Sequence, residues 1–202
     1  MTTLLLDVDG VLVGGRPGDG RHPFSDLERD FGFTHAQLET AFFHTGYWMA
    51  AVTGRAALPE CLTEALRAAD LDADVPQLID YWLRNDARVD PLVLEGVRAL
   101  RRRGIATILA TNQEHLRASY LLREMRLAED VTGIVYSAQL GCLKPDPEFF
   151  RLALDRTQLS VSDIVFVDDN PANVEAARRA GWPTAHWVAG SRLEPLVDAL
   201  LG

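Results

Sequence analysis

The chain has 202 residues, of which 48% are hydrophobic and 24% charged, and this ordinary globular usage excludes a disordered chain or a fibrous repeat. A formal net charge of -9 at pH 7 works against binding to nucleic acid or to an anionic membrane surface. The length suits a principal domain that carries a sizeable insertion.

Cysteine usage and the start of the chain bear on the compartment. Cys61 and Cys142 lie far apart, form no CxxC motif and are too few for a disulfide framework, which favours a reducing compartment. The segment before Asp7 contains no basic side chain, which argues against a signal peptide. Since no apolar run reaches the roughly 20 residues that cross a bilayer, we expect a cytoplasmic protein without a membrane anchor.

The first expected element is a short buried strand at residues 4–6, followed at once by Asp7-Val8-Asp9-Gly10. Asp and Gly both favour turns, so a plain strand-end turn is one interpretation. The other is chemical. Asp7 can attack as a nucleophile, while Asp9 gives a proton to the leaving oxygen and later takes one from water. Taken alone, the motif leaves both interpretations open.

Between Gly14 and about Val89, strand-like runs vanish and helix starts multiply. The expected starts are two capping boxes and an Asp-x-Pro turn, at Ser25-x-x-Glu28, Thr34-x-x-Gln37 and Asp74-Val75-Pro76. We predict a small α-helical cap domain at residues 15–89, inserted into a core domain of residues 1–14 and 90–202. Aromatic residues such as Phe43 and Trp48 could line a substrate pocket there or form the core of the cap.

Strands and helices alternate in the rest of the chain. The remaining expected elements are a helix at 92–103, a strand at 105–110, helices at 114–126 and 147–156, a strand at 164–167 and a helix at 171–180. Short continuous apolar runs are typical of strands covered on both faces of a parallel sheet. The alternation predicts a doubly wound α/β fold, in which ligands bind beyond the carboxyl ends of the strands. The polar residues that end the three expected strands should therefore converge.

Two further polar motifs have both plain and chemical explanations. Thr111 and Asn112 follow the second expected strand and could simply cap the next helix. A hydroxyl and a backbone N–H at a helix N-terminus are also well suited to hold phosphoryl oxygens.

Lys144 precedes a turn in which Asp146 and Pro147 start a helix, and a lysine there is most often structural. Several carboxylates that meet a phosphate nevertheless need a cation, and a lysine held by a rigid turn supplies one.

Asp168 and Asp169 close the third expected strand, where Asn170 and Pro171 form an ordinary helix start. Two adjacent carboxylates at a strand end are harder to explain by that turn alone. Oxygen ligands with open positions suit magnesium, which is usually held by few carboxylates together with the substrate. We therefore expect Mg²⁺ to be bound by Asp7 and Asp169, with Asp168 in support.

In this order, the motifs resemble the four signature motifs of the haloacid dehalogenase superfamily. The residues that carry the resemblance are Asp7-Val-Asp9-Gly-Val-Leu, Ala110-Thr111-Asn112, Leu143-Lys144-Pro145-Asp146 and Val167-Asp168-Asp169-Asn170-Pro171-Ala-Asn173-Val. The resemblance covers residues 1–14 and 90–202 and implies a Rossmann-like sheet. The insertion after the first strand resembles the helical cap of the superfamily's first subclass, whose members include sugar-phosphate phosphatases.

The resemblance also implies a role for each motif residue. Asp7 would be the nucleophile, and Asp9 the acid and base, with its backbone carbonyl also a metal ligand. The full implied site has catalytic Asp7 and Asp9, substrate-binding Thr111, Asn112 and Lys144, and metal-binding Asp7, Asp9, Asp169 and Asp168. The implied activity is magnesium-dependent hydrolysis of a small phosphorylated metabolite, such as a sugar phosphate, through an aspartyl-phosphate intermediate.

Three other functions are weighed against this hypothesis. A 2-haloacid dehalogenase would use the same nucleophile, but its halide leaves without a proton and Asp9 would be superfluous. A phosphomutase would return the phosphoryl group to its substrate, and nothing in the sequence separates it from a hydrolase. A catalytically inactive binding protein would be expected to have lost a charged motif residue, and none is missing. The expected partner is a small phosphorylated molecule, and the oligomeric state is open.

Overall fold

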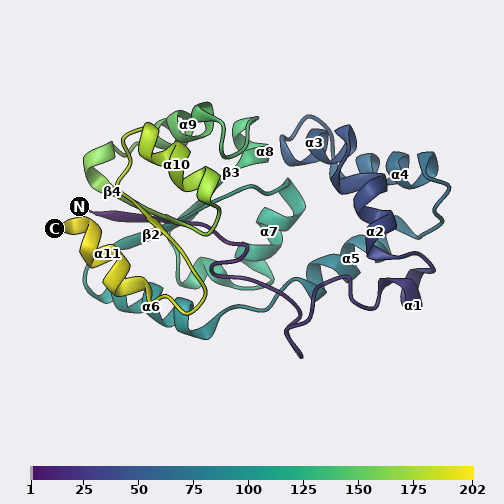
Figure 1. Cartoon of the computed structure of the whole chain (residues 1–202), viewed down its shortest axis with the longest axis horizontal. Coiled ribbons are helices and arrows are strands. Elements are labelled where there is room, and N and C mark those ends of the chain that lie inside the picture. The colour runs from purple at the N-terminus through teal and green to yellow at the C-terminus, as the bar shows by residue number, and fades with distance from the viewer. Residues whose placement is uncertain (1) are drawn as a thin grey trace.

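The computed structural model describes residues 2–202 of the chain. Within them, five parallel strands form one sheet in the order β3-β2-β1-β4-β5. The strands are β1 (Thr3–Leu6), β2 (Ala106–Thr111), β3 (Gly133–Tyr136), β4 (Ile164–Asp168) and β5 (Thr184–His186). Helices cover both faces of this sheet (Figure 1), which confirms the predicted doubly wound, Rossmann-like α/β fold.

The helices around the sheet bury its two faces separately. They are α6 (Pro91–Arg102), α7 (His115–Arg123), α8 (Ser137–Leu140), α9 (Pro147–Thr157), α10 (Pro171–Arg179) and α11 (Leu193–Leu201), with short turns η2 (Leu127–Glu129) and η3 (Val161–Asp163). Leu4 and Leu6 pack into the apolar cluster formed with α6 and α11, whereas Leu5 packs with α9 and α10. Figure 1 shows these helix pairs on opposite sides of the sheet. Strand β1 is buried on both faces, which explains its unbroken apolar run.

The register of the sheet places the polar strand ends side by side. Leu6 of β1 pairs with Leu109 of β2 and with Val167 of β4. The backbone N–H of Asp7 continues this ladder by donating to the carbonyl of Val167 over 2.9 Å. Since all three strands run in the same direction, Asp7, the end of β2 and Asp168 meet at the carboxyl edge of the sheet.

Helices dominate the chain between β1 and α6. They are α1 (Leu27–Phe31), α2 (His35–Leu38), the π-helical turn η1 (Glu39–Phe43), α3 (Gly46–Val52), α4 (Leu58–Ala68) and α5 (Val75–Asn85). These elements lie together at one end of the molecule (Figure 1). Their buried side chains form an apolar cluster of their own, which includes Phe42, Leu62 and Trp82.

The two linkers to this helical bundle run next to each other. Val13 and Val89 form an antiparallel bridge, the N–H of Gly14 donates to the carbonyl of Arg88, and the N–H of Asp90 donates to the carbonyl of Leu12. A further bond joins the bundle to the sheet edge, because Ser137 Oγ donates to the carbonyl of Val52 over 2.6 Å. The two ends of the inserted segment are thus bonded to each other, and Val52 within the segment is bonded to the residue that follows β3.

Most of the expected helix starts are confirmed by side-chain caps. Thr34 and Gln37 form the capping box of α2, and Asp74 accepts an N–H at the start of α5. Asp146 and Asn170 cap α9 and α10, each with proline at the start of the helix.

The expected capping box at Ser25 and Glu28 is wrong. Helix α1 begins at Leu27 with Asp26 as its N-cap, and the Ser25 hydroxyl donates to the carbonyl of His22 instead. Ser25 therefore stabilises the preceding turn, a use of serine that competes with helix capping.

Among residues 2–202, no helix has both the length and the apolar composition that crossing a membrane requires.

Candidate active site

Three carboxylates gather at the carboxyl ends of β1 and β4. Asp7, Asp168 and Asp169 each offer an oxygen, and these oxygens lie within 4.8 Å of one another. Asp7 is 7% exposed and Asp168 is fully buried. Carboxylate oxygens are the ligands that magnesium prefers, so the donor set fits this ion.

Lys144 lies inside this acidic cluster. Its Nζ atom is 2.9 Å from Asp7 Oδ1 and 2.6 Å from Asp168 Oδ2, and it also donates to the carbonyl of Ala110 over 2.7 Å. The side chain of Asn112 holds the lysine backbone from both sides, because Oδ1 accepts from Lys144 N at 2.8 Å and Nδ2 donates to Lys144 O at 2.9 Å. Asn112 therefore positions Lys144 through its side chain.

Burial and charge shift the pKa values of this cluster in opposing ways. Burial raises the pKa of Asp7 to about 7, although Lys144 works against this rise. Burial lowers the pKa of Lys144, but Asp7 and Asp168 outweigh it, so the pKa of the lysine ends above its usual value. Burial and the charge of Asp168 raise the pKa of Asp169. A cation beside Asp7 and Asp169 would favour their ionised forms.

The two neighbouring acids of the fourth motif have different surroundings. Asp168 is fully engaged, because it pairs with Lys144, accepts the N–H of Asn170 at 2.8 Å and accepts Asn173 Nδ2 at 3.1 Å on both oxygens. Asp169 lies over the backbone of Gly10, where an added Cβ would overlap its Oδ2 atom. Gly10 also has φ +79°, a conformation that favours glycine.

The carboxylate of Asp9 is not part of this group of three and has partners of its own. Gln113 Nε2 donates to Asp9 Oδ2 at 2.5 Å, and Arg117 Nη2 lies 3.4 Å from Asp9 Oδ1. The Asp9 side chain is 51% exposed, whereas that of Arg117 is 1% exposed. Arg117 also pairs with Asp86 of the second linker at 3.0 Å. The arginine thus joins the loop that follows β1 to the end of the helical insertion.

Thr111 and Asn112 lie at the same sheet edge, but before a helix rather than in its first turn. Helix α7 begins at His115 and is capped by Glu114, which accepts the N–H groups of Leu116 and Arg117. The alternative interpretation, in which Thr111 and Asn112 cap this helix, is therefore wrong. Thr111 ends β2, and Gln113 Nε2 lies 3.5 Å from its hydroxyl.

Sequence reasoning did not single out Gln113, Arg117 and Asp86. Gln113 and Arg117 are 104 and 108 positions from Asp9, and no local pattern marks them. Only Arg117 could have been noticed in the sequence, because a basic side chain near the start of a helix is electrostatically unfavourable.

Known proteins resemble the chain over most of its length. The family model for haloacid dehalogenase-like hydrolases matches residues 1–181. The plasmid phosphoglycolate phosphatase of Cupriavidus necator is 29% identical over 191 residues, which cover 90% of this chain and 78% of that protein. The mouse protein acyl-CoA dehydrogenase family member 10 is 34% identical over 117 residues, but the match spans 55% of this chain and only 10% of that protein.

Solved structures share the fold. A haloacid dehalogenase family enzyme from Bacteroides thetaiotaomicron, in complex with magnesium and inorganic phosphate, superposes with a TM-score of 0.78 at 18% identity. The match covers 97% of this chain and 98% of that one.

Proposed function

The chain belongs to the haloacid dehalogenase-like hydrolase family. We propose that it is a magnesium-dependent phosphatase of small phosphorylated metabolites, such as sugar phosphates. The observation that carries the proposal is the position of Asp7. It lies 2.9 Å from Lys144 Nζ and within 4.8 Å of the carboxylates of Asp168 and Asp169. The proposed nucleophile thus lies beside a buried cation and beside the two carboxylates that we propose as metal ligands.

In the proposed reaction, Asp7 attacks phosphorus and the bond from phosphorus to the leaving oxygen breaks. Asp9 gives its proton to that oxygen, so the alcohol departs and an aspartyl phosphate remains on Asp7. Asp9 then takes a proton from water, which attacks the phosphorus, releases inorganic phosphate and restores Asp7. The Asp9 side chain is 51% exposed, so a leaving group can approach it from solvent.

The remaining motif residues hold charge in place. Lys144 offsets the negative charge of the incoming phosphate and of Asp7, and Asn112 fixes the lysine backbone. Thr111 and the backbone N–H of Asn112 would bind phosphoryl oxygens. Magnesium, when bound by Asp7, Asp169 and the backbone carbonyl of Asp9 with Asp168 in support, would stabilise the negative charge of the phosphoryl group.

We further propose that residues 15–89 are a cap domain on a core of residues 1–14 and 90–202, and that the protein acts in the cytoplasm. The separate apolar cluster of the helical bundle and the adjacent linkers support the division. Of the alternative functions, the dehalogenase is disfavoured by Asp9, and the inactive binding protein by the intact set of charged motif residues.

The test is release of inorganic phosphate from a panel of phosphorylated metabolites, with millimolar magnesium and with chelator. We expect turnover with magnesium, its loss in chelator, and no turnover for Asp7→Asn. Asp198→Asn serves as a matched control, because Asp198 pairs with Arg103 at the surface of the sheet domain. Undiminished turnover in chelator, or near wild-type activity of freshly purified Asp7→Asn, would show that the proposal is wrong. Return of the phosphoryl group to the substrate in place of its release would identify a phosphomutase.

A further inference from the structure

A pocket of about 330 Å³ opens beside Asp9, between the loop that follows β1 and the helical insertion. One wall consists of the rings of Phe24, Phe43 and Trp82. The rings of Phe43 and Trp82 meet edge to face with centroids 5.3 Å apart, and those of Phe24 and Phe43 are 5.8 Å apart. The wall is therefore a packed aromatic surface next to the proposed proton donor.

Two histidines also line this pocket. The rings of His22 and His35 have centroids 4.3 Å apart, and His35 Nε2 lies 3.7 Å from Glu39 Oε1. Burial, and then the neighbouring His22, lower the pKa of His35 below its usual value. At neutral pH, His35 is therefore an uncharged hydrogen-bonding group rather than a cation.

The charged groups on the pocket wall are acidic. Asp9, Glu39 and Asp86 line the pocket, and none of the described residues that line it is a lysine or an arginine. Arg117 lies behind Asp9 and Asp86 and is paired with both of them. The Arg117 side chain is only 1% exposed, and it is not among the residues that line the pocket.

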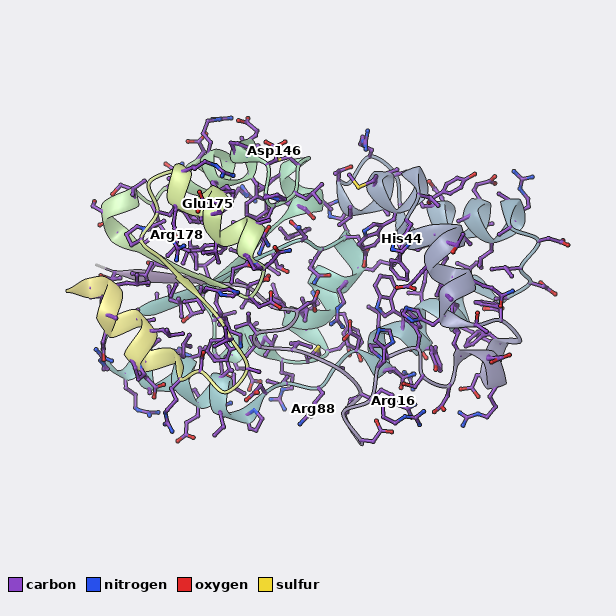
Figure 2. All side chains as sticks on the ribbon, in the orientation of Figure 1. Arg16, His44, Arg88, Asp146, Glu175 and Arg178 are labelled. Atoms are coloured by element: carbon purple, nitrogen blue, oxygen red, sulfur yellow. The ribbon has the colours of Figure 1, made fainter. Side chains whose placement is uncertain are left out.

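The arginines of the linkers do not change this charge balance. Figure 2 labels Arg16 and Arg88 near the linkers at the base of the helical insertion. Arg16 is paired with Asp26, and Arg88 lines a neighbouring hollow of about 110 Å³ together with Asp90. Neither belongs to the lining of the larger pocket.

We propose that this pocket holds the alcohol portion of the substrate and selects an uncharged alcohol with an apolar ring over one that carries a carboxylate. The inference rests on the proposed phosphatase function and deepens it. A ring can stack against the aromatic wall, and hydroxyls can bond to the histidines. A carboxylate would meet the like charges of Asp9 and Glu39 without a partner cation, and this repulsion disfavours its binding.

The proposal separates this chain from the named activity of its Cupriavidus relative, since 2-phosphoglycolate carries a carboxylate next to the ester. The assay measures phosphate release in magnesium from benzyl phosphate and from 2-phosphoglycolate. Both are esters of primary alcohols, so the comparison changes mainly the charge and the ring. We expect kcat/KM for benzyl phosphate to be higher by at least roughly 10-fold, the low end of what one matched apolar contact supplies.

A charge reversal tests the cause of the preference. Glu39→Lys places a cation in the pocket and should lower the ratio of the two kcat/KM values by about 10-fold, mainly through KM for 2-phosphoglycolate. Glu64→Lys is the matched control, because Glu64 lies on the exposed face of α4, where it pairs with Arg67. This control should leave the ratio unchanged.

The outcomes distinguish the inference from the function on which it rests. Preference of the wild type for 2-phosphoglycolate, or equal changes in Glu39→Lys and Glu64→Lys, would overturn the inference and leave the phosphatase function standing. Failure to release phosphate even from a minimal aryl phosphate would overturn both.

Discussion

Neighbouring acids of the fourth motif should respond oppositely to the same substitution. Asp169 is part of the acidic cluster, whereas Lys144 pairs with Asp7 and Asp168. Two unit charges 4.8 Å apart repel by about 3 kcal/mol at an effective dielectric constant near 20. Water entry and relaxation reduce this, so we expect Asp169→Asn to stabilise the metal-free protein by roughly 1 kcal/mol, or about 2 to 4 °C in Tm for a chain of this size.

Asp168→Asn should destabilise the protein, although it removes the same charge from the adjacent position. Asp168 is fully buried and lies 2.6 Å from Lys144 Nζ. Removal of one partner of a buried ion pair costs about 3 to 5 kcal/mol. Since Asp7 still faces the lysine at 2.9 Å, the lower value is expected, which corresponds to a fall of about 6 to 12 °C in Tm.

The assay is thermal melting of the wild type and both variants in chelator at pH 8, above the pKa of about 7 of Asp7, so that this carboxylate is mostly ionised. A second series adds magnesium. At about 100 times its Kd, a ligand that binds only the folded state stabilises it by about 2.7 kcal/mol. The wild type should gain most of this and Asp169→Asn much less. If Asp169→Asn melts below the wild type in chelator, or if magnesium shifts both equally, the proposed metal site is wrong.

Three more substitutions follow from the site. Asp9→Asn should lower kcat by roughly 100-fold to 10000-fold, the usual effect of losing acid-base catalysis. With an ester that has a good leaving group, a burst assay should show that the rate of aspartyl-phosphate formation is partly restored. An unchanged kcat would exclude Asp9 as the acid. Gly10→Ala should weaken the response of Tm to magnesium, because its Cβ would overlap Asp169 Oδ2; Gly104→Ala, also at positive φ but with no heavy atom near its added Cβ, is the control for backbone strain. Arg117→Met should lower the free energy of unfolding by about 2 kcal/mol, less than for a wholly buried pair because Asp9 is half exposed; a denaturant melt with no change in midpoint would contradict this.

The sequence alone was sufficient for the central elements of the fold. Strands β1 and β4 are short and buried on both faces, and β2 is mostly buried, so their burial is visible as short runs of mainly apolar residues. The capping residues of α2, α5, α9 and α10 were also found, because a cap is a local contact between neighbours in the chain. The edge strands β3 and β5 were missed, since they are short and only partly buried and their pairing depends on the neighbouring strand.

The motif residues could be named from the sequence, but their surroundings required the tertiary structure. The adjacency of Asp7 and Asp169 follows from the convergence of parallel strands, which a sequence pattern predicts. Lys144 lies in the loop between α8 and α9, and only the tertiary structure brings it to Asp7. The different roles of Asp168 and Asp169 depend on which carboxylate faces Lys144 and Asn173, and two consecutive aspartates look alike in the sequence. The contacts of Asp9 with Gln113 and Arg117 join residues more than 100 positions apart in the chain. The charge of the pocket beside Asp9 depends on which side chains of the helical insertion face the loop that follows β1. Local patterns specify elements and caps because their partners are near in the chain, whereas the environment of each charge is set by packing between distant segments.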